Sequence, residues 1–193
     1  MRAVRVAVRV VAVVAASGLL TGCVEPVDIG VRADCGDPVR VDNPVLVLMA
    51  QAVPTSTMVP CIRLVPASWR HGEVDVRRGR AAFDFASGSV DSTDSVPLSV
   101  VLTRTCDVSG ATEVPTDEPG TRRWERLRQV QPAYVGDRFY VFEGGCAQLI
   151  FALSGDDRAQ QVGEASLAVG FVSRTAVQAG VRDRTDAELD PRP

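Results

Sequence analysis

The acidic segment 107–118 holds the residues best suited to metal binding or acid–base chemistry. Its carboxylates are Asp107, Glu113, Asp117 and Glu118, on a stretch that also carries proline. Carboxylate oxygens are the ligands that Ca²⁺ prefers, and a pair of carboxylates is also the equipment of many hydrolases. The Asp-x-Asp-x-Asp-Gly spacing of an EF-hand is absent. The alternative is a solvated loop, which the turn-forming residues of this segment also favour.

A cluster of arginines around one tryptophan follows directly. It consists of Arg122, Arg123, Trp124, Arg126 and Arg128. Guanidinium groups bind carboxylates and phosphates through paired N–H donors, and tryptophan is enriched where proteins bind one another. We therefore take these five residues as a candidate interaction surface. The alternative is a surface strand or helix whose arginines pair with the acidic segment before it, because surface charges commonly neutralise each other.

The chain offers little for nucleophilic or metal-dependent catalysis. His71 is its single histidine, and no Gly-x-Ser-x-Gly turn is present to expose a serine nucleophile. No two cysteines have the Cys-x-x-Cys spacing that zinc sites and thiol–disulfide enzymes use. The sequence therefore assigns no catalytic residue, no metal and no cofactor.

The N-terminus has the parts of a secretory signal. Arg2, Arg5 and Arg9 form a basic start, and the apolar run 10–20 leads to small residues before Cys23. This run is too short to span a bilayer permanently, which takes about 20 apolar residues. We therefore expect residues 1–22 to be removed.

The tetrapeptide Leu20-Thr21-Gly22-Cys23 resembles the lipobox of bacterial lipoproteins. The resemblance implies diacylglycerol on the Cys23 thiol, cleavage before Cys23 and anchoring of the mature chain by lipid. It implies a location at the outer face of the plasma membrane, with the membrane bound through Cys23. The alternative is an ordinary secretory signal, with Cys23 as a further disulfide partner.

Four cysteines remain after lipidation of Cys23: Cys35, Cys61, Cys106 and Cys146. In an oxidising compartment an even number predicts two disulfides, with three possible connectivities. We favour Cys35–Cys61 with Cys106–Cys146, because Cys106 ends one expected strand and Cys146 begins another. Antiparallel neighbours would bring these two thiols together.

Composition and charge narrow the function classes. The chain carries 21 basic residues, all arginine, against 24 acidic residues. Loss of residues 1–22 removes three arginines and no acid, so the mature chain is more acidic still. An acidic protein gives no support for nucleic-acid binding. Aromatic residues make up only 5% of the chain, which argues against a carbohydrate-binding surface built on stacked rings.

The hydrophobic pattern predicts one α+β domain over residues 43–182, with a polar tether before it at 23–42 and a charged tail after it at 183–193. We expect a mostly antiparallel sheet of about five strands, with helices packed on one face. Residues 54–68 are expected to be extended or looped, and 121–131 fit either a helix or a strand.

The individual elements follow from capping, alternation and turn signals. Asn43-Pro44 and the apolar spacing up to residue 52 favour a helix there, and the alternative is a strand over Val45–Met49, because the run is short and partly β-branched. After it we expect a hairpin of 73–77 with 80–86, a polar loop at 87–95, a strand over 96–105, a loop at 107–120, a second hairpin of 138–143 with 146–154, a helix from Asp156 or Asp157 to 169, and a short helix capped by Ser173.

Several motifs resemble an uncharacterised group of secreted or membrane-anchored actinobacterial proteins. The resemblance covers roughly residues 44–182. It rests on Met58-Val59-Pro60-Cys61-Ile62, Val65-Pro66 before Trp69, the stretch 106–115, Pro119-Gly120-Thr121-Arg122-Arg123 and Gly144-Gly145-Cys146. It brings no known activity and therefore assigns no functional residue.

These observations favour a non-catalytic cell-envelope lipoprotein that binds a protein or an envelope component. The alternative is an envelope hydrolase that uses the carboxylates of segment 107–118, with or without Ca²⁺.

Overall fold

The computed structural model describes residues 32–190 except 38, 40, 88–95 and 157. The lipobox with Cys23, most of the expected tether and nearly all of the expected polar loop at 87–95 lie outside the described residues. Within the described part, none of the helices combines the length and the apolar character needed to cross a membrane.

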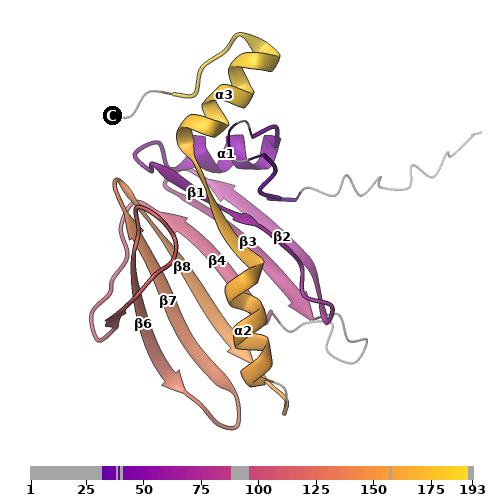
Figure 1. Cartoon of the computed structure of the whole chain (residues 1–193), viewed down its shortest axis with the longest axis vertical. Coiled ribbons are helices and arrows are strands. Elements are labelled where there is room, and N and C mark those ends of the chain that lie inside the picture. The colour runs from indigo at the N-terminus through magenta and orange to yellow at the C-terminus, as the bar shows by residue number, and fades with distance from the viewer. Residues whose placement is uncertain (1–31, 38, 40, 88–95, 157, 191–193) are drawn as a thin grey trace, which may run out of the picture.

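The described residues form three helices and nine strands (Figure 1). In chain order these are α1 (Pro44–Ala52), β1 (Met58–Ile62), β2 (Trp69–Arg77), β3 (Arg80–Ser87), β4 (Leu98–Thr103), β5 (Thr112–Val114), β6 (Arg122–Gln129), β7 (Tyr134–Phe142), β8 (Gly145–Leu153), α2 (Arg158–Ala168), β9 (Val169–Ser173) and α3 (Arg174–Thr185). Seven strands make one antiparallel sheet in the order β2-β3-β4-β8-β7-β6-β5, and β1 pairs with β9 in a separate antiparallel ribbon.

Side-chain alternation gives the large sheet one apolar face, which we call the inner face. Across its central strands Phe83 lies opposite Val100, and Val100 lies opposite Leu149. All three are almost fully buried. Their neighbours on the same face are Phe85, Leu98, Leu102, Ala147, Phe151 and Leu153, which are buried too. This face supplies most of the hydrophobic core.

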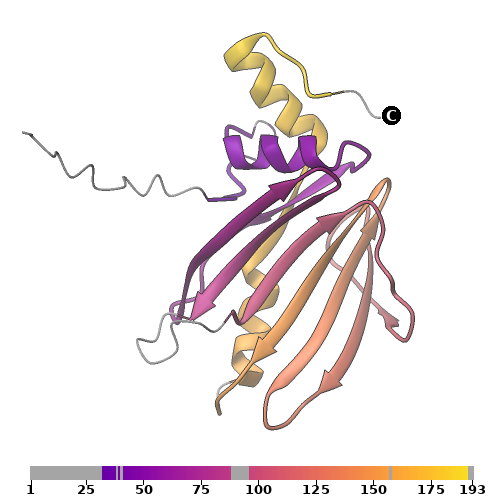
Figure 2. The same ribbon diagram turned by 180° about the vertical axis from the view of Figure 1, so that it is seen from behind.

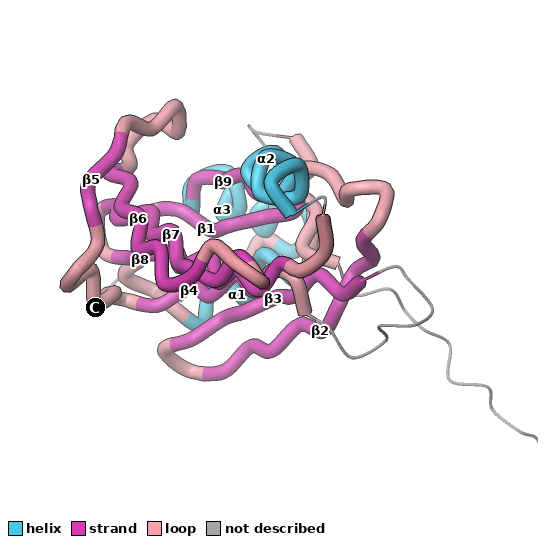
Figure 3. The backbone as a smooth tube through the Cα atoms, turned by 90° about the horizontal axis from the view of Figure 1, so that it is seen from below, coloured by secondary structure: helices cyan, strands magenta, loops and turns pink. Residues whose placement is uncertain are grey.

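The β1–β9 ribbon and α2 cover the inner face. Figure 3, seen from below, shows both on the same side of the large sheet. Val59 and Cys61 of β1 and Val172 of β9 belong to the core, and α2 contributes Ala165 and Ala168. Figure 2 shows the opposite, outer face of the sheet in front, with α2 and β9 behind it. No described helix covers the outer face, although the segment after β4 lies against part of it through the Cys106–Cys146 bond and the Arg126 hydrogen bond to Ser109.

Helices α1 and α3 pack together at one end of the molecule (Figure 1). The Asn43 side chain accepts hydrogen bonds from the backbone N–H groups of Val45 and Leu46, which confirms the expected N-cap of α1. Ser173 caps α3 in the same way, through a bond from the N–H of Ala176, and this expectation is confirmed as well.

Both favoured disulfides are present: Cys35 is bonded to Cys61, and Cys106 is bonded to Cys146. The first holds the N-terminal segment against β1. There the N–H of Cys35 donates to the carbonyl of Ile62, and the N–H of Ile62 donates to the carbonyl of Ala33. Ala33 and Val41 are fully buried, so the compact domain begins well before residue 43.

The C-terminal boundary also extends beyond the expected residue 182. Helix α3 continues to Thr185, and Asp186 ends it in a left-handed conformation. The chain then turns back, and Leu189 is buried with its N–H bonded to the Gln178 side chain. The Asp190 N–H bonds to the side chain of Gln51. Leu189 therefore attaches the described part of the expected tail to the domain, although the residues around it remain exposed.

The expected sheet of about five strands is an undercount. The mostly antiparallel architecture and the two disulfides are confirmed, but β1, β5, β6 and β9 add to the strands anticipated from alternation. Strand β9 lies between the two helices expected at the C-terminal end, and β1 lies in a proline-rich stretch that was expected to be extended or looped. The helices were expected to pack on one face of the sheet. Of the three described helices, α2 does so, whereas α1 and α3 pack at the end of the sheet.

The close contact between α3 and the N-terminal segment depends on Gly180. The Val41 N–H donates to the Ala176 carbonyl, and a Cβ at Gly180 would overlap the Val41 carbonyl.

We expect Gly180→Ala to lower the free energy of unfolding by about 1–3 kcal/mol, despite the better helix propensity of alanine. Gly163→Ala in α2 is the matched control, since nothing lies near its added Cβ. It should leave stability unchanged or raise it by up to about 1 kcal/mol. Urea unfolding of both variants measures this, and equal effects would contradict the packing.

Candidate functional site

Residues 122–129 form strand β6, so the predicted arginine cluster is divided between the two faces of the sheet. Arg122, Trp124 and Arg126 lie opposite Val141, Phe139 and Asp137 of β7 on the outer face. Arg128 reaches Asp137 on this same face. Arg123 lies opposite Tyr140 on the inner face. The proposed surface of five residues is thus reduced to four, which we call the arginine face.

Asp137 organises the arginine face although its side chain is 0% exposed. Arg126 donates to one of its oxygens from Nε at 3.1 Å. Arg128 donates from Nε at 3.1 Å and from a terminal nitrogen at 2.5 Å. The Gln148 amide donates from 3.1 Å. Arg126 also lies over the ring of Phe139, with its guanidinium carbon 5.1 Å from the ring centroid. Arg126 and Arg128 are therefore occupied within the protein.

Arg122 is held differently, at the edge of the sheet. Two of its N–H groups bind both oxygens of Glu113 on β5, at 2.8 and 2.9 Å. This hydrogen-bonded pairing holds the pKa of the Glu113 carboxyl below its usual range. The Arg122 guanidinium also lies over Trp124, 5.3 Å from the ring centroid. Arg122 remains largely exposed, so it presents a fixed cation above an aromatic surface.

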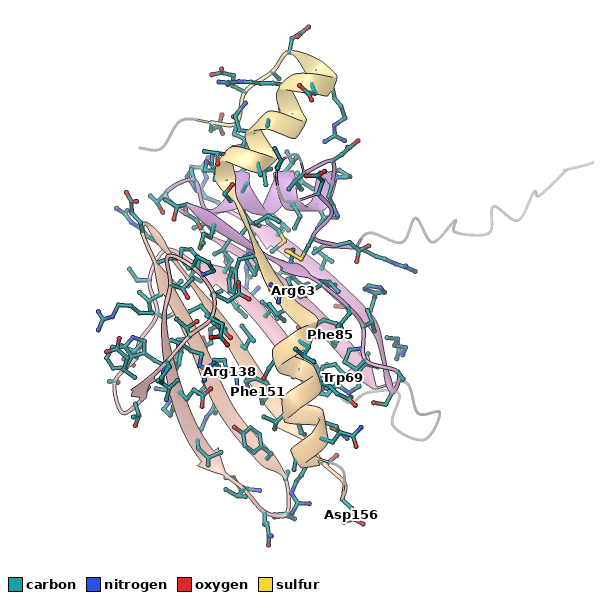
Figure 4. The ribbon with its side chains drawn as sticks, viewed as in Figure 1. Arg63, Trp69, Phe85, Arg138, Phe151 and Asp156 are labelled. Carbon is teal, nitrogen blue, oxygen red and sulfur yellow. A yellow bond between two sulfur atoms is a disulfide. The ribbon has the colours of Figure 1, made fainter. Side chains whose placement is uncertain are left out.

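On the inner face Arg123 and Glu125 belong to a separate network below α2. Glu125 accepts from Arg138 Nε at 2.7 Å, and Arg138 also donates to the Ser166 hydroxyl of α2. Arg138 lies over Phe151, and Figure 4 shows these two residues beside α2. These contacts join the helix to the sheet, which accounts for Arg138 and Glu125 by packing alone.

The four carboxylates of segment 107–118 are engaged at different places. Asp107 interacts with Ser109, whose hydroxyl and then backbone N–H lower the pKa of the Asp107 carboxyl by hydrogen bonding. Glu118 pairs with Arg63 at 2.9 Å. Glu113 binds Arg122, as described above, and Asp117 is exposed. Across the described residues, no three His, Cys, Asp or Glu side chains come together to hold a metal ion. The geometry gives the carboxylate site no support.

His71 lies on β2, opposite Phe85, and its Nδ1 is buried without a hydrogen-bond partner among the described residues. Burial lowers the pKa of its imidazole, and the charge of Arg32 lowers it further against the opposing effect of Asp34. The side chain pairs with the core-facing Phe85 in the sheet register, so a packing role accounts for its position.

A hollow of about 430 Å³ opens beside the exposed end of the arginine face. Its walls come from the segment after β4, from the start of β6, and from the end of β7 with the turn into β8. The lining residues are Arg104, Thr105, Cys106, Val108, Arg122, Trp124, Val141, Phe142, Gly144, Gly145 and Cys146. The Cys106–Cys146 disulfide forms part of the wall, because it joins the segment after β4 to the start of β8.

Sequence reasoning missed Arg104 as a member of this site. It lies about twenty residues before the arginine cluster, and no motif marks it. The available signal was the expected Cys106–Cys146 bond, which brings the segment beside Arg104 to the β7–β8 turn. What the cysteines could not indicate was the position of β6 relative to that bond.

Comparisons with known proteins add little to this site. No family model matches the chain, and no curated protein matches it. A crystal structure from Bacteroides thetaiotaomicron VPI-5482 is similar at 10% sequence identity, with a TM-score of 0.32. The similarity covers 61% of this chain and 45% of that chain, so this chain spans less than half of the other's length. A likeness of this size carries no argument about function.

The role given to Asp137 predicts an unequal cost for removing two aspartates. Asp137→Asn leaves two arginines without their buried counter-ion, and we expect the free energy of unfolding to fall by about 2–4 kcal/mol. Asp75 is the control, because its half-exposed carboxylate also contacts two arginines, Arg77 and Arg80. Asp75→Asn should cost less than about 1 kcal/mol. Urea denaturation of both variants decides this, and similar costs would show that the Asp137 contacts add nothing.

Proposed function

We propose that this protein is a lipid-anchored, non-catalytic domain at the outer face of the plasma membrane, and that it binds a protein or an envelope component. The binding surface lies on the outer face of the sheet at the start of β6. It is formed by Arg122 and Trp124 together with the hollow beside them. The N-terminal sequence supports the location, since its lipobox-like tetrapeptide ends at Cys23.

The observation that carries the proposal is an aromatic and cationic surface on the face of the sheet that no described helix covers. Trp124 is only partly buried there, and the Glu113 carboxylate holds Arg122 over its ring. Tryptophan and arginine are the residues whose loss most often weakens protein interfaces. A side chain fixed before binding also loses less entropy on association.

The short connection to the proposed anchor supports the same function. Ala33 is already buried in the domain, ten residues after Cys23. Fully extended, ten residues span at most about 35 Å. The domain would therefore remain close to the lipid surface, where it meets membrane-bound partners at a raised effective concentration.

Photo-crosslinking in intact membranes tests the proposal. A photoreactive amino acid at Thr105, an exposed wall residue of the hollow, should give a discrete adduct with one partner. The same group at Arg78, on the exposed β2–β3 turn, is the control and should not give that adduct. Trp124→Ser should abolish the adduct at Thr105. Cys23→Ser should release the protein from the membrane fraction and reduce the adduct with it.

Two outcomes would overturn the proposal. Identical adducts from Thr105 and Arg78 would show that the β6 surface has no preference for a partner. Retention of Cys23→Ser in the membrane fraction would show that Cys23 does not anchor the chain.

A further inference from the structure

The chemistry of the hollow points to the kind of group it accommodates. A volume of about 430 Å³ lies within the range typical of small-molecule sites, roughly 300–1,000 Å³. Most of its lining is apolar, supplied by Val108, Trp124, Val141, Phe142 and the Cys106–Cys146 disulfide. Such a wall favours a compact hydrophobic body over a heavily charged ligand such as a polyphosphate.

Two guanidinium groups border this apolar wall, and no carboxylate lines it. Arg122 is already bound to Glu113 through two of its N–H groups. Arg104 is exposed and forms no ion pair with any residue in the described part of the chain. The hollow therefore carries an excess of about one positive charge, and its planar donors match a carboxylate in two-point contact.

The surrounding structure fixes Arg122 over Trp124, and it fixes the backbone beside Arg104, before any ligand arrives. The disulfide at Cys106 ties the segment just after Arg104 to β8. Glu113 fixes Arg122, and Arg122 lies over Trp124. Arg104 thus approaches the hollow from the segment after β4, and Arg122 and Trp124 approach it from β6.

We propose that the hollow binds a monovalent carboxylate attached to one compact apolar group. This inference rests on the proposed binding function and names the chemistry that the β6 surface recognises. Arg104 holds the carboxylate, and the apolar group lies against Trp124 and Val141. A free small acid and the last residue of a peptide chain both present this chemistry.

Titration calorimetry with matched probes tests this on the full chain in detergent. The probes are N-acetylphenylalanine, its C-terminal amide, N-acetylglycine, and a tripeptide that ends in phenylalanine with a free carboxylate. N-acetylphenylalanine should bind at least about tenfold more tightly than its amide, because a charged hydrogen bond is lost. It should also bind more tightly than N-acetylglycine, which lacks the apolar group. A tripeptide that binds more tightly than N-acetylphenylalanine indicates a peptide end as the natural source, and a weaker tripeptide indicates a small acid.

Arg104→Gln should weaken binding of the acid about tenfold and leave binding of the amide unchanged. Arg78→Gln, an exposed arginine on the β2–β3 turn, should change neither. In ¹⁵N spectra the indole signal of Trp124 should shift on titration, while that of the buried Trp69 should not.

Equal binding of the acid and the amide, or no binding of any carboxylate, would overturn the inference. An unchanged affinity in Arg104→Gln would overturn it as well. These failures are separable from failure of the proposed function, because the adduct at Thr105 would persist in the crosslinking experiment if a partner binds the surface by other contacts.

Discussion

A buried carboxylate on the open side of a sheet is the constraint on which the arrangement of this surface depends. Asp137 lies on the outer face, yet Arg126, Arg128 and Gln148 cover it completely. Burying a carboxylate costs several kcal/mol unless charged donors compensate for the lost water. Strand β6 must therefore present two arginines to β7. This requirement fixes the strand's register and determines which cations remain for other roles.

As a consequence, arginines that look equivalent in the sequence have different partners and different roles in the structure. Arg126 and Arg128 neutralise Asp137, and Arg138 joins α2 to the sheet through Glu125 and Ser166. Arg122 is half engaged by Glu113 and stays at the surface, whereas Arg104 is left unpaired among the described residues. Positive character is therefore concentrated at one end of the arginine face, beside the hollow, and not along the whole of β6.

The sequence predicted the elements whose signals are local. The Asn43 cap and the hairpins follow from capping and alternation, and the favoured pairing of the four cysteines follows from their even number and from the expected strands beside Cys106 and Cys146. Strands β1 and β9 were not anticipated, because Pro60 suggests a loop and Val169 falls on the apolar stripe of the helix predicted before it. Their strand character comes from pairing with each other across more than a hundred residues, with Val59 opposite Val172. Local propensity does not contain such a contact.

The candidate site shows the same limit. The composition of the β6 segment identified a cluster of arginine and tryptophan residues. The sequence fits either a helix or a strand there, and the two structures would divide these residues between faces differently. Only the pairing of β6 with β7 separates Arg123 from Arg122. The role of Arg104 depends further on three distant segments meeting at the Cys106–Cys146 bond. A pattern of residues could therefore suggest the surface but not its boundary.

Hydrogen exchange of the arginine Nε–H groups, measured by NMR, tests most directly whether Asp137 holds Arg126 and Arg128 and leaves Arg104 free. We expect Nε–H of Arg126 and Arg128 to exchange slowly, because each donates a hydrogen bond to the buried Asp137 carboxylate, and Nε–H of Arg104 to exchange as fast as in a free peptide. Equally fast exchange at all three would contradict this expectation, since Asp137 would then organise no part of the surface.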